Sequence, residues 1–284
     1  ASTGLFYLVN TLGAIAGVLL AGLLGLGTIG ANGVSALVVV ATGLFGAALL
    51  AGMRGSGDPA RFRLAPAVAM TVCVAALGAA AFERGPLLAK PDMELVHVEE
   101  GRYGVLQVYE YDDDLCLEQT CRVMYMNNTS VVHIAGAPTT HYAQQMQAHL
   151  GVAARPRTET ALVIGAGFGI TAGALAEMPR MGRVDVVEVA PSVVRSGELF
   201  RPHNFGYTDH PDINVIVDDG RHVLAASQTR YGVISANPTR PEVPQGAALF
   251  HTDFYDLVKA RLKDDGVFVQ FVYGPASPII VETL

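Results

Sequence analysis

Three glycines and one glutamate mark the stretch where the sequence most strongly indicates chemistry. Gly165, Gly167 and Gly169 follow a short apolar run, and Glu188 ends a second apolar run about 20 residues later. Glycine lets the chain turn tightly and lets a ligand approach the backbone. A carboxylate in the position of Glu188 accepts hydrogen bonds from ribose hydroxyls. We therefore predict a nucleoside-binding βαβ unit over 161–189. The alternative is a tight turn, with Glu188 as an ordinary solvated strand end.

The spacing of the glycines separates two classes of nucleotide site. The dinucleotide fingerprint requires Gly-x-Gly-x-x-Gly, but residue 170 is an isoleucine. The turn instead reads Gly-x-Gly-x-Gly, a variant that we associate with S-adenosylmethionine-type binding. The helix expected after the turn, at 171–177, points its first N–H groups at such a ligand.

The elements that must position these residues alternate along residues 136–284. Expected strands lie at 161–164, 184–187, 214–217, 231–235 and 267–272, with helix-like stretches between them. Such alternation predicts an α/β fold with a doubly wound, Rossmann-like parallel sheet. Ligands of these sheets bind at the carboxyl ends of the strands. The glycine turn, Glu188, Asp219 and the loop 235–241 all fall at such ends, so we expect them to surround one site.

Residues 1–85 have a different composition. No charged residue occurs from Ala1 to Met53. Three apolar runs are long enough to cross a bilayer, at 5–26, 33–51 and 64–82. Small residues recur every four positions in the first two runs, which lets membrane helices approach closely. We therefore expect a transmembrane helix bundle of three spans and an integral, multi-pass protein of the bacterial inner membrane. Three buried helices of a large soluble core are the alternative.

The charges leave open on which side of the membrane the residues after the third run lie. Arg54, Arg61 and Arg63 lie between the second and third runs, which favours a cytoplasmic loop under the positive-inside rule. Three crossings then place the remainder on the far side. A cytosolic cofactor would require the opposite orientation.

Residues 86–135 are interpreted as a linker followed by a small β-meander, with turn signals between its strand-like runs. Cys116 and Cys121 flank its first loop and would pair in an oxidising compartment. Two reduced thiols are equally consistent with the sequence. The cysteines show no zinc-ligand spacing, so no metal is expected. The formal net charge of −7 argues against a nucleic-acid partner.

Six blocks of the sequence, in order, resemble the spermidine synthase-like family of polyamine aminopropyltransferases, and more closely its membrane-anchored branch. They are RYGVLQV, HYAQQM, VIGAGFGITAGAL, VDVVEVAPSVV, DDGRHVL and ALFHTDFYDLVKARLKDDGVFVQ. In that family, the glycine loop and the acid after the second strand hold the methionine-derived part and ribose of a sulfonium nucleoside. The Asp of the Asp-Gly pair faces the adenine amino group. The resemblance implies these roles for Gly165, Gly167, Gly169, Glu188 and Asp219, with S-adenosylmethionine or its decarboxylated form as co-substrate.

Relative to members of the membrane-anchored branch, we expect the chain to be shorter at both ends. The loop 235–241 also departs from the family pattern. Aminopropyl-transferring members carry an Asp in this loop that accepts a proton from the attacking amine. Here the loop reads Ser-Ala-Asn-Pro-Thr-Arg-Pro. Asn237 cannot act as a base, and Arg240 would repel a diammonium substrate if it faced the site. The resemblance places aromatic and polar substrate contacts at His141 and Tyr142. These two residues and Asn237 are therefore the candidate catalytic residues, and surface or capping roles are the alternative.

Two functional hypotheses follow, and an enzyme is favoured. The first is a membrane-anchored transferase that passes an aminopropyl or methyl group from the sulfonium nucleoside to a small-molecule acceptor. The missing carboxylate indicates that it is not a standard putrescine aminopropyltransferase. The second is a non-catalytic structural subunit of a membrane complex, built on a degenerate spermidine synthase-like fold. Expected partners are the lipid bilayer, a small-molecule acceptor, and either other membrane subunits or a second copy in a homodimer.

Overall fold

The computed structural model describes residues 92–117, 119–127, 129–135, 137–238 and 244–272, together with Gly17. The chain divides into two units, and nearly all of these residues belong to the second, which comprises Lys90–Glu99 and Tyr103–Leu284. The three expected membrane spans lie outside the described residues. Among the helices that are described, none has both the length and the apolar character needed to cross a bilayer.

A four-stranded antiparallel sheet precedes the α/β part of the chain, as the sequence predicted for the β-meander. Its strands are hydrogen-bonded in chain order. They are β1 (Glu94–Gly101), β2 (Gly104–Asp112), β3 (Thr120–Met126) and β4 (Thr129–Ala135). The first strand was not anticipated, although exposed and half-buried side chains alternate along most of it, which is the pattern of a strand with one face against the protein.

The second sheet has five parallel strands and confirms the predicted doubly wound fold. Its spatial order is β7-β6-β5-β8-β9, and every neighbouring pair is parallel. The strands are β5 (Thr160–Ile164), β6 (Arg183–Glu188), β7 (Ile213–Val217), β8 (Tyr231–Ala236) and β9 (Leu262–Gln270). The chain builds outward from β5 in one direction and then in the other, so the switch point lies between β5 and β8. Ligands of such sheets bind at this crevice.

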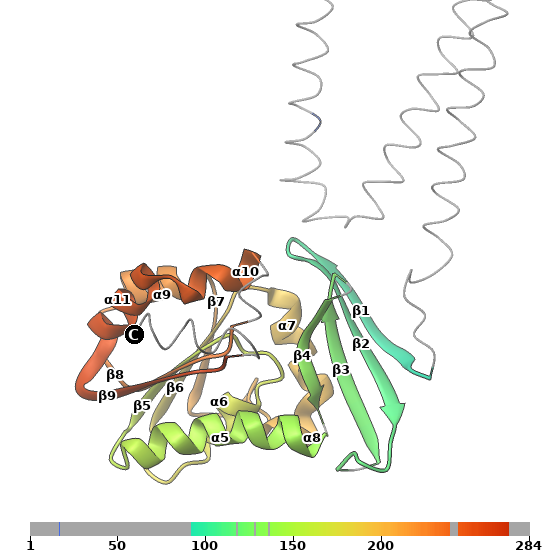
Figure 1. The fold of residues 1–284 in the computed structure, drawn as a ribbon, viewed down its shortest axis with the longest axis horizontal. Helices are drawn as coiled ribbons and strands as arrows, with labels where there is room; N and C mark the ends of the chain where they lie inside the picture. Colours follow the sequence, from blue (N-terminus) through green and yellow to red (C-terminus); the bar gives the residue numbers. More distant parts are fainter. Residues whose placement is uncertain are drawn as a thin grey trace, which may run out of the picture. The chain divides into compact units, whose positions relative to one another are not determined.

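Helices cover both faces of this sheet (Figure 1). Helices α5 (Pro138–Ala154) and α6 (Ile170–Ala176) lie on one face, and α9 (Gly220–Ala226) and α11 (Thr252–Arg261) lie on the other. Each face has its own buried apolar core, with alanines from α5 and α6 in one and Leu224 and Phe254 in the other. The shorter helical segments are α7 (Pro191–Ser196), η2 (Gly197–Phe200), α8 (Arg201–Asn204), α10 (Pro244–Ala247) and η3 (Ala248–Phe250).

A third core joins the antiparallel sheet to the glycine turn. Leu106 and Met124 of the antiparallel sheet pack in one buried cluster with Phe168, which lies between the last two glycines of the turn. The rings of Phe168 and Phe200 lie with centroids 4.3 Å apart. All four side chains are fully buried. The antiparallel sheet therefore supplies part of the apolar support of the turn.

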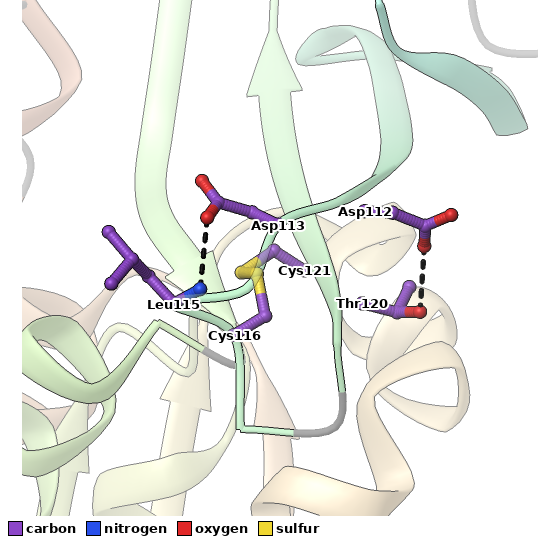
Figure 2. The surroundings of a disulfide bond; sticks show 6 residues. All are labelled: Asp112, Asp113, Leu115, Cys116, Thr120 and Cys121. Atoms are coloured by element: carbon purple, nitrogen blue, oxygen red, sulfur yellow. Dashed lines mark hydrogen bonds between the residues drawn. A yellow bond between two sulfur atoms is a disulfide. The ribbon is translucent and has the colours of Figure 1, made fainter.

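A disulfide between Cys116, in the loop that connects β2 and β3, and Cys121, in β3, closes this loop (Figure 2). Both cysteines are buried. The Leu115 N–H donates to the Asp113 carboxylate (2.9 Å), and farther along the loop the Thr120 hydroxyl donates to the Asp112 carboxylate (3.0 Å). The sequence was consistent with either a disulfide or two reduced thiols, and the structure contains the disulfide.

Replacing Cys116 and Cys121 together by alanine should lower the free energy of unfolding by about 2 kcal/mol, because the short loop loses its constraint in the unfolded chain. Thermal unfolding of the full chain in mild detergent measures the change. A reductant should destabilise the wild type by a similar amount and leave the double variant unaffected. Equal stabilities of wild type and variant without reductant would contradict the expectation.

Candidate functional site

The turn after β5 has a left-handed backbone at each of its three glycines. The φ angles are +87° at Gly165, +52° at Gly167 and +88° at Gly169. A Cβ at Gly165 would lie 2.8 Å from the Asn237 carbonyl oxygen, and one at Gly169 would lie 2.0 Å from the Tyr207 ring. The space beside these two glycines is therefore filled by the chain itself, and a side chain at either position is excluded by both conformation and contact.

Glu188 holds the turn from the end of β6. Its Oε2 accepts a hydrogen bond from the Ala166 N–H (3.0 Å) and its Oε1 accepts one from the Ala190 N–H (3.0 Å). Only 9% of the residue is exposed, so Glu188 is not a solvated strand end. Burial raises the pKa of its carboxyl group, and backbone N–H donors, including those of Val189 and Gly167, act in the opposite direction. The residue expected at the ribose thus also clamps the turn.

Asp219 caps the helix that follows β7. Its Oδ1 accepts from the Arg221 N–H (2.8 Å), and its Oδ2 accepts from the Arg221 guanidinium (2.9 Å). These interactions lower the pKa of the Asp219 carboxyl group, chiefly through the side-chain hydrogen bond. Asp219 is therefore ionised at neutral pH, with both oxygens already engaged by Arg221. A ligand amino group must share this carboxylate with the arginine.

Asn237 lies against the turn from the neighbouring strand β8. Its Nδ2 donates to the Gly165 carbonyl (3.3 Å) and to the Thr171 hydroxyl (3.4 Å). The Thr171 hydroxyl donates its proton to the Gln144 carbonyl (3.1 Å), so its oxygen accepts the hydrogen bond from Asn237. This pattern fixes the orientation of the amide. The remaining Oδ1 is buried and has no hydrogen-bond partner among the described residues.

Thr171 was not anticipated as a site residue. It is buried and connects α5, α6 and the end of β8 through the two hydrogen bonds of its hydroxyl. The available signal was its position two residues after the last glycine of the turn. That position does not reveal which distant strand end it meets, because the partner is 66 residues away in sequence.

The two other candidate catalytic residues, His141 and Tyr142, lie on α5 and differ in burial. His141 is 8% exposed, and its Nε2 lies 3.0 Å from the Gln145 amide nitrogen. The other ring nitrogen, Nδ1, is buried without a hydrogen-bond partner in the described part of the chain. Burial, followed by the nearby His203, lowers the pKa of His141. Tyr142 instead is 55% exposed. Their catalytic roles remain predictions.

A cleft of ≈ 660 Å³ opens beside Asp219, between α9 and the segment η3–α11. Its polar lining includes Asp219, Arg221, His222, His251 and Asp253, and apolar side chains such as Phe254 form part of its wall. Arg240, which lies in the loop after β8, is outside the described residues. Within the ranges that the structure covers, no group of three or more His, Cys, Asp or Glu side chains is arranged to hold a metal ion.

Comparison with known proteins identifies relatives for about half of the chain. Residues 140–274 match the Spermine/spermidine synthase domain. The polyamine aminopropyltransferase of Bacillus subtilis is 33% identical over 131 residues, which cover 46% of this chain and 47% of the relative. Polyamine aminopropyltransferase 1 of Pseudomonas aeruginosa is 31% identical over 126 residues, 44% of each chain. The chain thus spans about half the length of these curated relatives.

Solved structures share the fold over a larger part of the chain. A spermidine synthase crystallised with the transition-state analogue AdoDATO superposes with a TM-score of 0.55 at 20% identity, covering 62% of this chain and 57% of that one. Spermidine synthase from Thermotoga maritima gives a TM-score of 0.53, also at 20% identity, with coverage of 62% and 56%. These values establish the common architecture of the two sheets and their helices.

Replacing Glu188 by glutamine should lower the free energy of unfolding by about 2 kcal/mol, because the new amide group turns N–H donors toward backbone N–H donors. The matched control is Glu177→Gln, the same chemical change at an exposed glutamate, which should change stability by less than about 0.5 kcal/mol. Thermal unfolding measures both variants. Equal effects would contradict the clamping role of Glu188.

Proposed function

Because residues 140–274 match the Spermine/spermidine synthase domain, we propose that the chain binds a sulfonium nucleoside and transfers an alkyl group from it to a small-molecule acceptor. The observation that carries the proposal is the hydrogen-bonded junction of the glycine turn, Glu188 and Asn237 at the switch point of the sheet. The sulfonium is already activated, so the protein's main contribution is to align donor and acceptor.

The names of the relatives favour an aminopropyl group over a methyl group. Both curated relatives are called polyamine aminopropyltransferases, and one structural neighbour carries AdoDATO, described as a transition-state analogue. We therefore propose decarboxylated S-adenosylmethionine as the co-substrate, with S-adenosylmethionine as the competing candidate. Glu188 would share its carboxylate between the turn and the ribose, and Asp219 would lie near the adenine.

The acceptor must become nucleophilic without help from Asn237. An amide oxygen can accept a hydrogen bond from an N–H or O–H group of the acceptor, but it cannot take the proton at neutral pH. No carboxylate is among the described hydrogen-bond partners of Asn237. An attacking amine would therefore have to arrive neutral or lose its proton to solvent. This argues for an acceptor other than putrescine under ordinary conditions. The proposed repulsion by Arg240 would act in the same direction.

The second candidate function is a non-catalytic subunit that keeps the fold without the reaction. Two observations favour it: the Glu188 oxygens are occupied by backbone donors, and those of Asp219 by Arg221. A nucleoside would have to compete with these donors or share the oxygens. Under either function, we propose that residues 1–85 anchor the chain in the bilayer, because no charged residue occurs from Ala1 to Met53.

Binding of a nucleoside separates the two candidates. Isothermal titration of the full chain in mild detergent should show micromolar binding of decarboxylated S-adenosylmethionine, in competition with 5′-methylthioadenosine. Glu188→Ala should weaken binding by ~1–3 kcal/mol through lost hydrogen bonds to the ribose, whereas Glu177→Ala should not. The absence of heat with any of these nucleosides would exclude the transferase and leave the structural subunit.

The role of the missing carboxylate is tested by an assay with decarboxylated S-adenosylmethionine and putrescine. The wild type should form little spermidine at neutral pH, and Asn237→Asp should gain activity because the new carboxylate can accept the amine proton. Asn237→Ser, which alters the same position without adding a base, should stay inactive. Spermidine formation by the wild type at about 1 s⁻¹ or faster would contradict this reading of the loop.

A further inference from the structure

The cleft beside Asp219 has a carboxylate and a guanidinium next to each other in its lining. Both Asp219 and Arg221 line the cleft. The Asp219 Oδ2 accepts a hydrogen bond from the Arg221 Nη2 (2.9 Å), and the Oδ1 accepts a longer one from the Arg221 Nε (3.3 Å). The second terminal nitrogen of the guanidinium, Nη1, makes no hydrogen bond within the described residues. The pair thus offers a ligand both lone pairs and N–H groups.

The cleft begins at the strand ends where the nucleoside is proposed to bind. The Asp218 N–H donates to the Glu188 carbonyl (3.2 Å), so the strand ends that carry Glu188 and Asp219 are adjacent. A Cβ at Gly220 would lie 2.5 Å from Ile164, the last residue of β5 before the glycine turn. A ribose bound at Glu188 can therefore extend its base toward Asp219. The volume of ≈ 660 Å³ falls within the roughly 300–1,000 Å³ of small-molecule sites.

The apolar lining of the cleft leaves room for a flat ring. Ala225 lines it from α9, and Ala247, Ala248 and Leu257 line it from the segment α10–α11. Three of these four side chains are single methyl groups. Among the described residues that line the cleft, Arg221 is the one with a permanent positive charge. A base in this cleft would therefore meet its charged hydrogen-bond donor at Arg221.

We propose that Arg221 lets this cleft accept purine nucleosides with either an amino or an oxo group at carbon 6; this inference rests on the proposed function. A 6-amino group donates to the Asp219 carboxylate, and a neighbouring ring nitrogen accepts from the guanidinium. A 6-oxo group instead accepts from the guanidinium, as the guanine O6 does in protein–DNA complexes, and the protonated N1 donates to the carboxylate. Without Arg221, the 6-oxo group would face only acceptors on Asp219.

The exposure of the ion pair allows a ligand to share it. The side chains of Asp219 and Arg221 are 41% and 47% exposed, and ion pairs at such positions are weak. The Arg221 backbone N–H donates separately to the Asp219 Oδ1 (2.8 Å) and caps α9. The guanidinium can therefore move toward a base while the cap stays in place. For the same reason, a change of the Arg221 side chain should leave the start of α9 intact.

Two thioether nucleosides that differ only at carbon 6, 5′-methylthioadenosine and 5′-methylthioinosine, test the role of Arg221. Isothermal titration of the full chain in mild detergent measures both dissociation constants, which should lie within about fivefold of each other in the wild type. Arg221→Met removes the donor and should raise the ratio of the inosine constant to the adenosine constant by about tenfold, the loss of one charged hydrogen bond. Arg221→Lys, which keeps a charged donor, should retain the wild-type ratio. So should Arg230→Met, at an exposed arginine paired with Asp264 outside the cleft lining.

The outcomes distinguish this inference from the proposed function. A wild type that binds neither nucleoside would contradict the proposed function, and the assignment of the cleft with it. A wild type that binds the adenosine compound and rejects the inosine compound would overturn the role of Arg221 alone. An unchanged ratio in Arg221→Met would do the same. Circular dichroism confirms folding, and Arg221→Ala provides a second removal of the donor if Arg221→Met does not fold.

Discussion

The Glu188 carboxylate connects two strand ends through the backbone of the glycine turn. Successive residues of the turn direct their N–H groups inward, and buried donors without a partner are costly. Glu188 satisfies donors on the turn and on the start of the next helix. On the other side of β5, the pairing with β8 brings Asn237 against Gly165. A bound ribose would therefore share a group on which the turn itself depends.

Asn237 is held in the same manner, by atoms that belong to the scaffold. Its amide nitrogen is directed at Gly165 and Thr171, and Thr171 in turn is tied to α5 through the Gln144 carbonyl. The carbonyl oxygen of the amide is the group left for a ligand. The side chain at this position is thus held in place without being able to accept a proton, so both a transferase with an altered loop and a structural subunit are consistent with one arrangement.

The parallel sheet and the glycine turn were predictable because apolar runs, glycines and their spacing are local features of the sequence. Contacts between distant segments were not. The ring of Tyr207 against Gly169, and the hydroxyl of Thr171 against Asn237, depend on how strand ends meet. His141 and Tyr142 were grouped because the resemblance places substrate contacts at both, yet successive helical residues point about 100° apart, so one is buried and the other exposed.

The packing of Phe168 has a consequence for the boundaries of the domain. The match to the family model begins at residue 140, but the buried cluster around Phe168 includes Leu106, Val108 and Met124 from the preceding sheet. A fragment cut at residue 140 would lose these three side chains and expose part of the apolar cluster to which Phe168 belongs. The segment that the family model matches is therefore smaller than the segment that supplies the apolar support of the turn.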